Sequence, residues 1–199
     1  ARVRRAWYYE GARLTVGAFV QACEMVWRGE LDNAVVFMVA AGHHAHRDYA
    51  WGGTYLSCIG PAVIRLRELG LERLAYLDTD AHHADGAREV LMGDKRVLHI
   101  CFCHQDVVED GGTKICVNVG WSSTDEAYLE RVRAVFPTIR AFGPQMLVHF
   151  LGHDTHADDY GSLGLSSDFF VELVRELKAL AEEICGGKYV IVHGGGANR

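Results

Sequence analysis

Tyr76-Leu-Asp-Thr-Asp-Ala-His-His-Ala-Asp-Gly86 is the stretch around which the rest of the chain is organised. It begins inside the apolar run Leu74–Leu77, which predicts a short buried strand. Three carboxylates and two imidazoles follow within eight positions, and such groups are very costly to leave unpaired where a buried strand ends. The pattern therefore predicts a bound cation, with a solvated acidic loop as the alternative.

Asp80 and His82 are the first two candidate ligands of this cation. Side chains two apart on an extended segment point to the same face, so both can reach one ion. A carboxylate oxygen with an imidazole nitrogen is a common ligand pair for zinc or iron. The third ligand must come from elsewhere in the chain. Asp154 is the best candidate, and His153 and His156 compete with it.

A set made of Asp80, His82 and Asp154 would offset most of a divalent charge and leave coordination positions open. Such openness is typical of a catalytic site, because structural zinc is usually closed by four Cys or His ligands. The metal could then lower the pKa of a bound water and polarise a substrate carbonyl. Zn²⁺ is the expected ion, and Fe²⁺ or Co²⁺ would fit the same ligands.

Size and composition favour one domain over residues 1–199, since the chain can bury a sizeable core and shows no linker. A net charge of -6 argues against nucleic-acid binding and suits a cationic substrate. No window approaches the roughly 20 apolar residues of a membrane span. Six scattered cysteines are expected to be reduced core thiols in a cytoplasmic protein. The chain does not begin with Met, so we expect a processed or excised piece.

Hydrophobic periodicity predicts that helices and strands alternate along the chain. The run Ala34–Ala40 is typical of a fully buried strand. The alternation predicts an α/β fold with a central, mostly parallel sheet. Helices are expected at 13–28, 55–69, 87–92, 125–136 and 166–184, and strands at 31–42, 74–77, 96–103, 113–119, 145–151 and 188–193.

Four of the expected strands end in reactive or flexible sequence. Ligands of open parallel sheets gather outside the carboxyl ends of the strands, so these endings are expected to form one site. The four endings are Gly42-His-His44, Asp78–Asp85, Gly152-His-Asp154 and His193-Gly-Gly-Gly196.

His43 and His44 are the natural general acid and base for a metal-bound water. Each needs a carboxylate partner to fix its tautomer and raise its basicity. Asp78 and Asp85 are the surplus acids nearby, which suggests His43–Asp78 and His44–Asp85 pairs. The alternative is a pair of solvated loop histidines.

Several elements together resemble the metal-dependent histone deacetylase and acetylpolyamine amidohydrolase family, in its order and at about its spacing. The resemblance runs from about residue 14 to the end of the chain. It implies an arginase-like, three-layer α/β sandwich and deacylation of an amide on a cationic amine by a metal-activated water. The elements are Gly29-Glu-Leu-Asp-Asn-Ala34, Gly42-His-His-Ala-His-Arg-Asp48, Leu77–Gly86, Gly152-His-Asp-Thr-His-Ala-Asp-Asp159, Leu163-Gly-Leu-Ser166 and His193-Gly-Gly-Gly-Ala-Asn198.

The resemblance also implies roles for individual residues. By motif match, the metal-ligand positions correspond to Asp80, His82 and Asp154. The acid/base positions correspond to His43 and His44, and their carboxylate partners to Asp78 and Asp85. A potassium ion beneath the active metal is a further family feature, but Cys101 stands at its serine position and a thiol is a poor potassium ligand.

The chain departs from the family pattern where substrate would be held. Ala197 replaces the tyrosine whose phenol hydrogen-bonds the substrate carbonyl, and losing such a donor typically costs about 10²–10³ in rate. His193 or His153 could stand in for it. Gly53 replaces a wall phenylalanine, and the loop 105–112 is short. The family's N-terminal rim segment is either absent or was removed, which favours a homo-oligomer or a partner subunit.

Three functions are compatible with these observations. The first is a metal-dependent amidohydrolase acting on an acylated small molecule or peptide, weakened or altered in substrate by Ala197. The second is a degenerate deacetylase-like subunit that binds metal and serves as a scaffold. The third is an arginase-type ureohydrolase, which would need two manganese ions and a second Asp-rich motif near Asp154.

Overall fold

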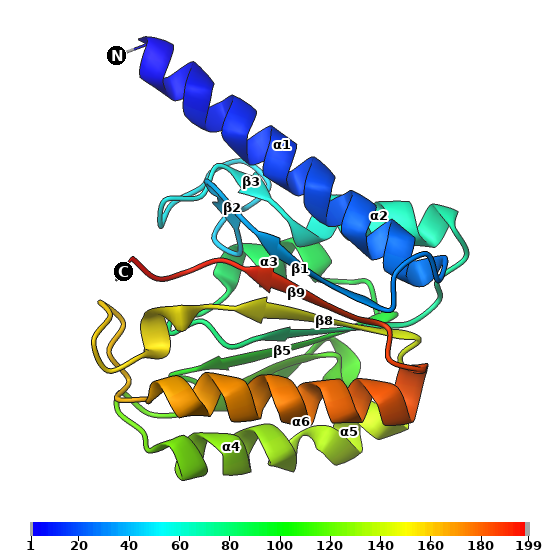
Figure 1. Ribbon diagram of the computed structural model, residues 1–199, viewed down its shortest axis with the longest axis vertical. Helices are drawn as coiled ribbons and strands as arrows, with labels where there is room; N and C mark the ends of the chain where they lie inside the picture. The colour runs from blue at the N-terminus through cyan, green and yellow to red at the C-terminus, as the bar shows by residue number, and fades with distance from the viewer. Residues whose placement is uncertain (1, 198–199) are drawn as a thin grey trace.

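The computed structural model describes residues 2–197, so Asn198, in the last element of the family pattern, lies outside the described residues. Over this range the chain forms a seven-stranded sheet in the order β1-β9-β8-β4-β5-β7-β6 (Figure 1). Every pairing in it is parallel except that of β6 with β7. The strands are β1 (Asn33–Phe37), β4 (Leu74–Asp78), β5 (Val97–Cys103), β6 (Val107–Glu109), β7 (Lys114–Asn118), β8 (Met146–Leu151) and β9 (Tyr189–His193).

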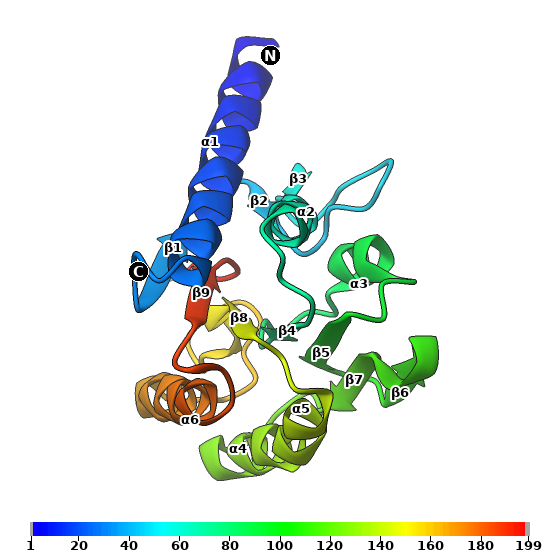
Figure 2. The same cartoon turned by 90° about the vertical axis from the view of Figure 1, so that its right-hand side faces the viewer.

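Helices cover both faces of the sheet and give the three-layer sandwich that the sequence predicts (Figure 2). All five residues of β4 are buried, as expected for a central strand with a hydrophobic core on each side. The helices of one layer are α1 (Arg2–Trp27), α2 (Ile59–Glu68) and α3 (Asp85–Leu91), and those of the other are α4 (Asp125–Ala134), α5 (Phe136–Phe142) and α6 (Ser167–Cys185).

The first strand of the sheet differs from its prediction. β1 lies at the edge of the sheet, and Val35 and Phe37 are 56% and 70% exposed, whereas Ala34 and Val36 pack against the core. The prediction of a fully buried strand at Ala34–Ala40 was therefore wrong. A continuous apolar run does not distinguish a central strand from an edge strand that is covered on one face only.

Helix boundaries differ from the predicted ranges at several points. The helix expected at 55–69 begins at Ile59, because the residues before it form the short strand β3 (Leu56–Ser57). The first helix begins at Arg2, because the residues before 13 continue the helix beyond the periodic stripe, with Trp7 80% exposed. The helix expected at 125–136 ends at Ala134, and a second short helix starts at Phe136, next to a proline in its first turn. Among the described residues, no helix is both long and apolar enough to cross a bilayer.

The predicted clustering of strand endings follows from the parallel sheet. The arrowheads of β8 and β9 point to the same side of the molecule (Figure 1). The loop after β4, the 3-10 turn η2 (His153–Thr155) after β8 and the glycine run after β9 meet at this edge. A short parallel pair, β2 (Ala41–Gly42) and β3 (Leu56–Ser57), leads directly into the two consecutive histidines.

Candidate active site and metal centre

Asp80, His82 and Asp154 come together at the carboxyl end of the sheet. One ligand atom from each lies within 4.8 Å of the others. His82 Nδ1 lies 3.0 Å from Asp80 Oδ1 and 2.9 Å from Asp154 Oδ2. Both carboxylates are almost fully buried, whereas His82 is half-buried. The structure thus brings together the three residues that the sequence analysis names as candidate ligands.

The chemistry of this group fits a divalent cation. Asp154 Oδ2 is buried and makes no hydrogen bond, even though His82 Nδ1 is near. Burial raises the pKa of Asp154, whereas for Asp80 the effect of burial is outweighed by His43 and His82, which lower its pKa to about 2. Two neighbouring buried carboxylates are costly to ionise together unless a cation lies between them.

Glycines explain how the backbone approaches these carboxylates so closely. A Cβ on Gly195 would lie 1.8 Å from Asp80 Oδ2, and one on Gly152 would lie 2.5 Å from the same oxygen. Gly195 also has a positive φ of 22°. The glycine run after β9 therefore clears space for the candidate metal ligands, which is the use of glycine where backbone must come near a ligand.

His43 is held by a buried carboxylate. Its Nδ1 lies 2.8 Å from Asp78 Oδ2, and its ring stacks on Phe150 with centroids 4.6 Å apart. Its Nε2 lies 3.6 Å from Asp80 Oδ1. Burial lowers the pKa of His43, but the attraction of Asp78 and Asp80 outweighs it and raises the pKa to about 9. His43 is therefore favoured in its protonated form.

His44 has the opposite electrostatic environment. Its Nδ1 lies 2.7 Å from Asp85 Oδ1, whose second oxygen accepts a hydrogen bond from the Trp51 indole at 2.9 Å. Burial and the neighbouring His43 lower the pKa of His44 to about 4. Both pairs suggested by the sequence are present. Two adjacent imidazoles with separated pKa values are the usual basis for assigning distinct acid and base roles.

The two histidines line one open cavity of about 280 Å³ together with Asp80 and His82, and Asp154 lies behind these two candidate ligands. Two aromatic residues that the sequence analysis did not single out complete its wall. The ring centroids of Trp51 and His44 lie 3.9 Å apart, and those of Tyr160 and His82 lie 5.6 Å apart. Tyr160 lies only six residues after Asp154 in the chain. This closeness to the third candidate ligand was the signal by which the sequence could have indicated it.

A third histidine of the same loop, His46, was also missed. Its ring nitrogens lie near Asp85 and Glu89, at 3.2 Å from Asp85 Oδ2 and in a short contact with Glu89 Oε2. His46 therefore shares the Asp85 carboxylate with His44.

The two histidines that competed with Asp154 for the metal are directed elsewhere. His153 Nδ1 lies 2.8 Å from His193 Nε2, and His153 Nε2 lies 3.4 Å from Asp159 Oδ2. His156 Nε2 lies 3.1 Å from the Ser167 hydroxyl. Neither belongs to the three-residue ligand group.

Small residues stand at the positions where the family pattern has side chains that contact substrate. Ala197 is exposed, and its backbone N–H donates to Asp159 Oδ2 at 3.0 Å. A Cβ on Gly53 would meet nothing within 4 Å, and Gly53 is not among the residues that line the cavity. The Tyr160 hydroxyl, which accepts from the Gly196 N–H at 3.4 Å, is the phenol that lines the cavity.

Comparisons with known proteins identify a matching family model and relatives of this chain. The family model "Histone deacetylase domain" matches residues 5–199. Curated relatives include a probable deacetylase of Archaeoglobus fulgidus, 32% identical over 203 residues, and a histone deacetylase-like amidohydrolase of Pseudomonas aeruginosa, 33% identical over 204 residues. Each match covers 94% of this chain, but 56% and 54% of the respective relative. The chain thus spans little more than half the length of these relatives.

Among solved structures, the crystal structure of the HDA15 HD domain has a TM-score of 0.84 to this chain. It is 24% identical, and the match covers 94% of this chain and 57% of that one. This likeness shows that the two share a fold.

Proposed function

The chain belongs to the histone deacetylase domain family, and we propose that it is a metal-dependent amidohydrolase that hydrolyses an acylated amine. One observation carries the proposal. Two histidine–carboxylate pairs and the group of three candidate ligands lie around one open cavity, and the buried Asp154 Oδ2 accepts no hydrogen bond although it lies 2.9 Å from His82 Nδ1.

Asp80, His82 and Asp154 would hold the metal ion. When bound, the ion supplies Lewis acidity toward water and toward the scissile carbonyl. The two carboxylates and one imidazole suit Zn²⁺, and Fe²⁺ or Co²⁺ would fit as well. The open cavity beside these side chains leaves room for water and substrate.

The two histidines would divide the proton chemistry. His44 fits the base, because burial and His43 keep its imidazole neutral and able to accept a proton. His43 fits the cationic partner, because Asp78 holds its Nδ1 and leaves its Nε2 directed toward the ligand group. Asp85 and Trp51 orient His44 from behind, so that its free nitrogen faces the cavity.

The side chains around the cavity favour a cationic amine as substrate. Trp51 and Tyr160 offer aromatic faces, on which a cationic amine gains electrostatic attraction. The net charge of -6 acts in the same direction.

The direct test is release of carboxylic acid by the purified 199-residue chain loaded with Zn²⁺, Fe²⁺ or Co²⁺. The panel should contain acyl-lysine peptides, acylpolyamines and simple amides with acyl groups of increasing size. We expect His44→Ala to lose about 10²–10⁴-fold in rate. His104→Ala is the matched control, since His104 stacks on Trp121 outside the cavity. Absence of acid release across the panel from metal-loaded protein would overturn the proposal.

A binding or scaffold subunit that keeps the metal is the second candidate, favoured by the lack of a side-chain donor at Ala197. Installing Ala197→Tyr separates the two. A gain of about 10²–10³-fold in rate would support a weakened enzyme. Unchanged, negligible turnover together with retained acyl-amine binding by calorimetry would support the binding role. The expected homo-oligomer or partner subunit stays a prediction, testable by light scattering.

A further inference from the structure

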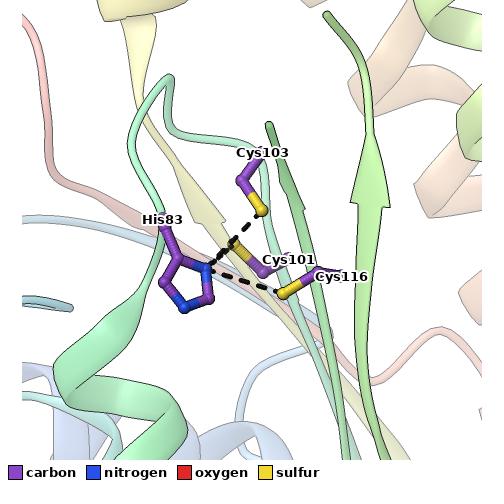
Figure 3. Close-up of side chains that lie close together, drawn as sticks. All are labelled: His83, Cys101, Cys103 and Cys116. Atoms are coloured by element: carbon purple, nitrogen blue, oxygen red, sulfur yellow. Dashed lines mark hydrogen bonds between the residues drawn. The ribbon is translucent and has the colours of Figure 1, made fainter. Parts of the chain in front are cut away.

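A second cluster of ligand-type side chains lies outside the proposed catalytic machinery. His83 Nδ1 lies 3.7 Å from Cys101 Sγ, 3.5 Å from Cys103 Sγ and 3.6 Å from Cys116 Sγ (Figure 3). The four ligand atoms lie within 4.8 Å of one another. We propose that this cluster is a second metal site, a closed Cys₃His site that binds Zn²⁺.

Strand pairing brings the three thiols together. Cys101 and Cys103 are two apart on β5, so both side chains leave the same face of the sheet. Cys116 is the direct partner of Cys101 on the neighbouring parallel strand β7. His83 approaches from the loop after β4, and Figure 3 shows its ring directed at the three sulfurs. All three cysteines are at least 97% buried and none forms a disulfide.

Hydrogen bonding does not account for this arrangement. An imidazole Nδ1 carries either one N–H or one lone pair, so it can make one good hydrogen bond, yet three sulfurs surround it. A tetrahedral zinc ion explains all three distances. With Zn–S near 2.3 Å and Zn–N near 2.05 Å, a tetrahedral angle places nitrogen and sulfur about 3.6 Å apart.

Two of the sulfurs accept hydrogen bonds from neighbouring groups. The backbone N–H of Ala84 donates to Cys101 Sγ at 3.4 Å, and Arg88 Nη1 donates to Cys116 Sγ at 3.3 Å. Arg88 is 7% exposed, and Glu109 and the Lys114 carbonyl hold its other nitrogens. Three thiolates, a neutral imidazole and Zn²⁺ carry one net negative charge, and the buried Arg88 guanidinium, which also pairs with Glu109, lies beside it. Such outer contacts orient and tune metal ligands.

Ligand type selects the metal and the role. Thiolates and imidazole suit zinc, and four protein ligands leave no open position, so the site would be structural. It would tie the loop that carries Asp80 and His82 to β5 and β7, since His83 belongs to that loop. This inference does not depend on the proposed hydrolase activity.

The first experiment isolates this site from the catalytic one. Asp154→Asn protein, expressed with zinc and purified without chelator, should retain one zinc per chain by mass spectrometry of metals. Its zinc X-ray absorption should show three sulfur neighbours near 2.3 Å and one nitrogen near 2.05 Å. Zinc with only nitrogen and oxygen neighbours, zinc-free protein, or a disulfide within the cluster would each overturn the proposal.

The second experiment tests the ligands by cobalt substitution. Co²⁺-loaded wild-type protein should show thiolate-to-cobalt charge-transfer absorption, and Cys103→Ser and Cys116→Ser should each lose most of it. Cys58→Ser is the matched control, because Cys58 is equally buried but lies outside the cluster. Unchanged absorption in both cluster variants would overturn the site. Should the variants fail to fold, the X-ray absorption of the Asp154→Asn protein still decides.

Discussion

His82 and His83 are consecutive residues with contrasting surroundings. His82 joins two carboxylates beside an open cavity, whereas His83 joins three thiols in a closed, buried cluster. Oxygen-rich ligands with free positions suit catalysis, and a full set of sulfur and nitrogen ligands suits structure. One loop thus serves both clusters, because adjacent side chains leave the backbone in different directions.

Removing a ligand from the open cluster should have the largest effect on activity. Lewis acidity from a bound metal is worth several kcal/mol, so Asp154→Asn should lower kcat/KM by about 10³-fold or more. The thiol cluster should keep its zinc. Steady-state kinetics and metal analysis on the same sample check both parts. Loss of both metals at once would show that the clusters are not independent.

Removing a ligand from the closed cluster should act mainly on stability. If free zinc exceeds the dissociation constant about 1,000-fold, binding adds about 4 kcal/mol, and its loss lowers Tm by roughly 8–16 °C for a domain of this size. We expect this shift for Cys103→Ser in zinc-containing buffer, with a smaller change for Cys58→Ser. Calorimetric scans with and without chelator measure it. Equal shifts in the two variants would contradict the distinction.

Replacing Asp85, the carboxylate that contacts His44, should lower activity by an intermediate factor and leave the thiol cluster unchanged. Asp85→Asn keeps the size of the side chain but loses the charge that holds His44 Nδ1 at 2.7 Å. Loss of such an outer partner typically costs 10–100-fold, so kcat/KM should fall by about that factor. Zinc at the cysteines should be unaffected. An unchanged pH–rate profile would argue against a positioning role for Asp85.

Titration of His149, which contacts the loop shared by the two clusters, should make the stability of the fold depend on pH. This effect should be smaller than the preceding ones. Thr79, at the start of that loop, lies 2.8 Å from His149 Nε2, and burial lowers the pKa of His149 from 6.5 to about 3. The unfolded chain therefore binds a proton that the folded chain excludes. Stability should fall as pH drops below about 6.5, by about 1.4 kcal/mol at about pH 5.5 from this group.

His149→Gln removes this titration while leaving an amide to bond Thr79. The acid-induced decrease in the free energy of unfolding between about pH 7 and 5 should therefore be smaller in His149→Gln than in wild type. Urea titrations at each pH check the difference. Parallel pH curves for the two proteins would show that His149 is not the group responsible.

Most residues of the open cluster and its neighbours could be named from the sequence, because the pattern that indicates them is local. One eight-residue stretch contains Asp78, Asp80, His82 and Asp85. The predicted strand just before it indicates that they lie at the carboxyl end of the sheet. Asp154 needed one further assumption, that parallel strands end at the same edge. The His–Asp pairings were suggested because Asp78 and Asp85 were the acids of that stretch left over once Asp80 had been assigned to the metal.

The thiol cluster gave no comparable signal. The cysteines were expected to be scattered core thiols; five of them are buried, Cys185 is partly exposed, and none forms a disulfide. Cys116 lies 13 residues beyond Cys103 with no paired spacing, and only the register of β5 against β7 sets it opposite Cys101. The edge position of β1 was missed for a related reason, since strand order is a property of the assembled sheet.

By itself, the sequence determined the α/β alternation, the ligand-bearing loop and the residues that follow each strand, because these depend on periodicity and short-range spacing. Only the tertiary structure decided that His82 and His83 serve different clusters, that Trp51 and Tyr160 wall the cavity, and that three distant thiols meet. Those outcomes depend on strand register and loop path. Contacts between residues far apart in the chain set both.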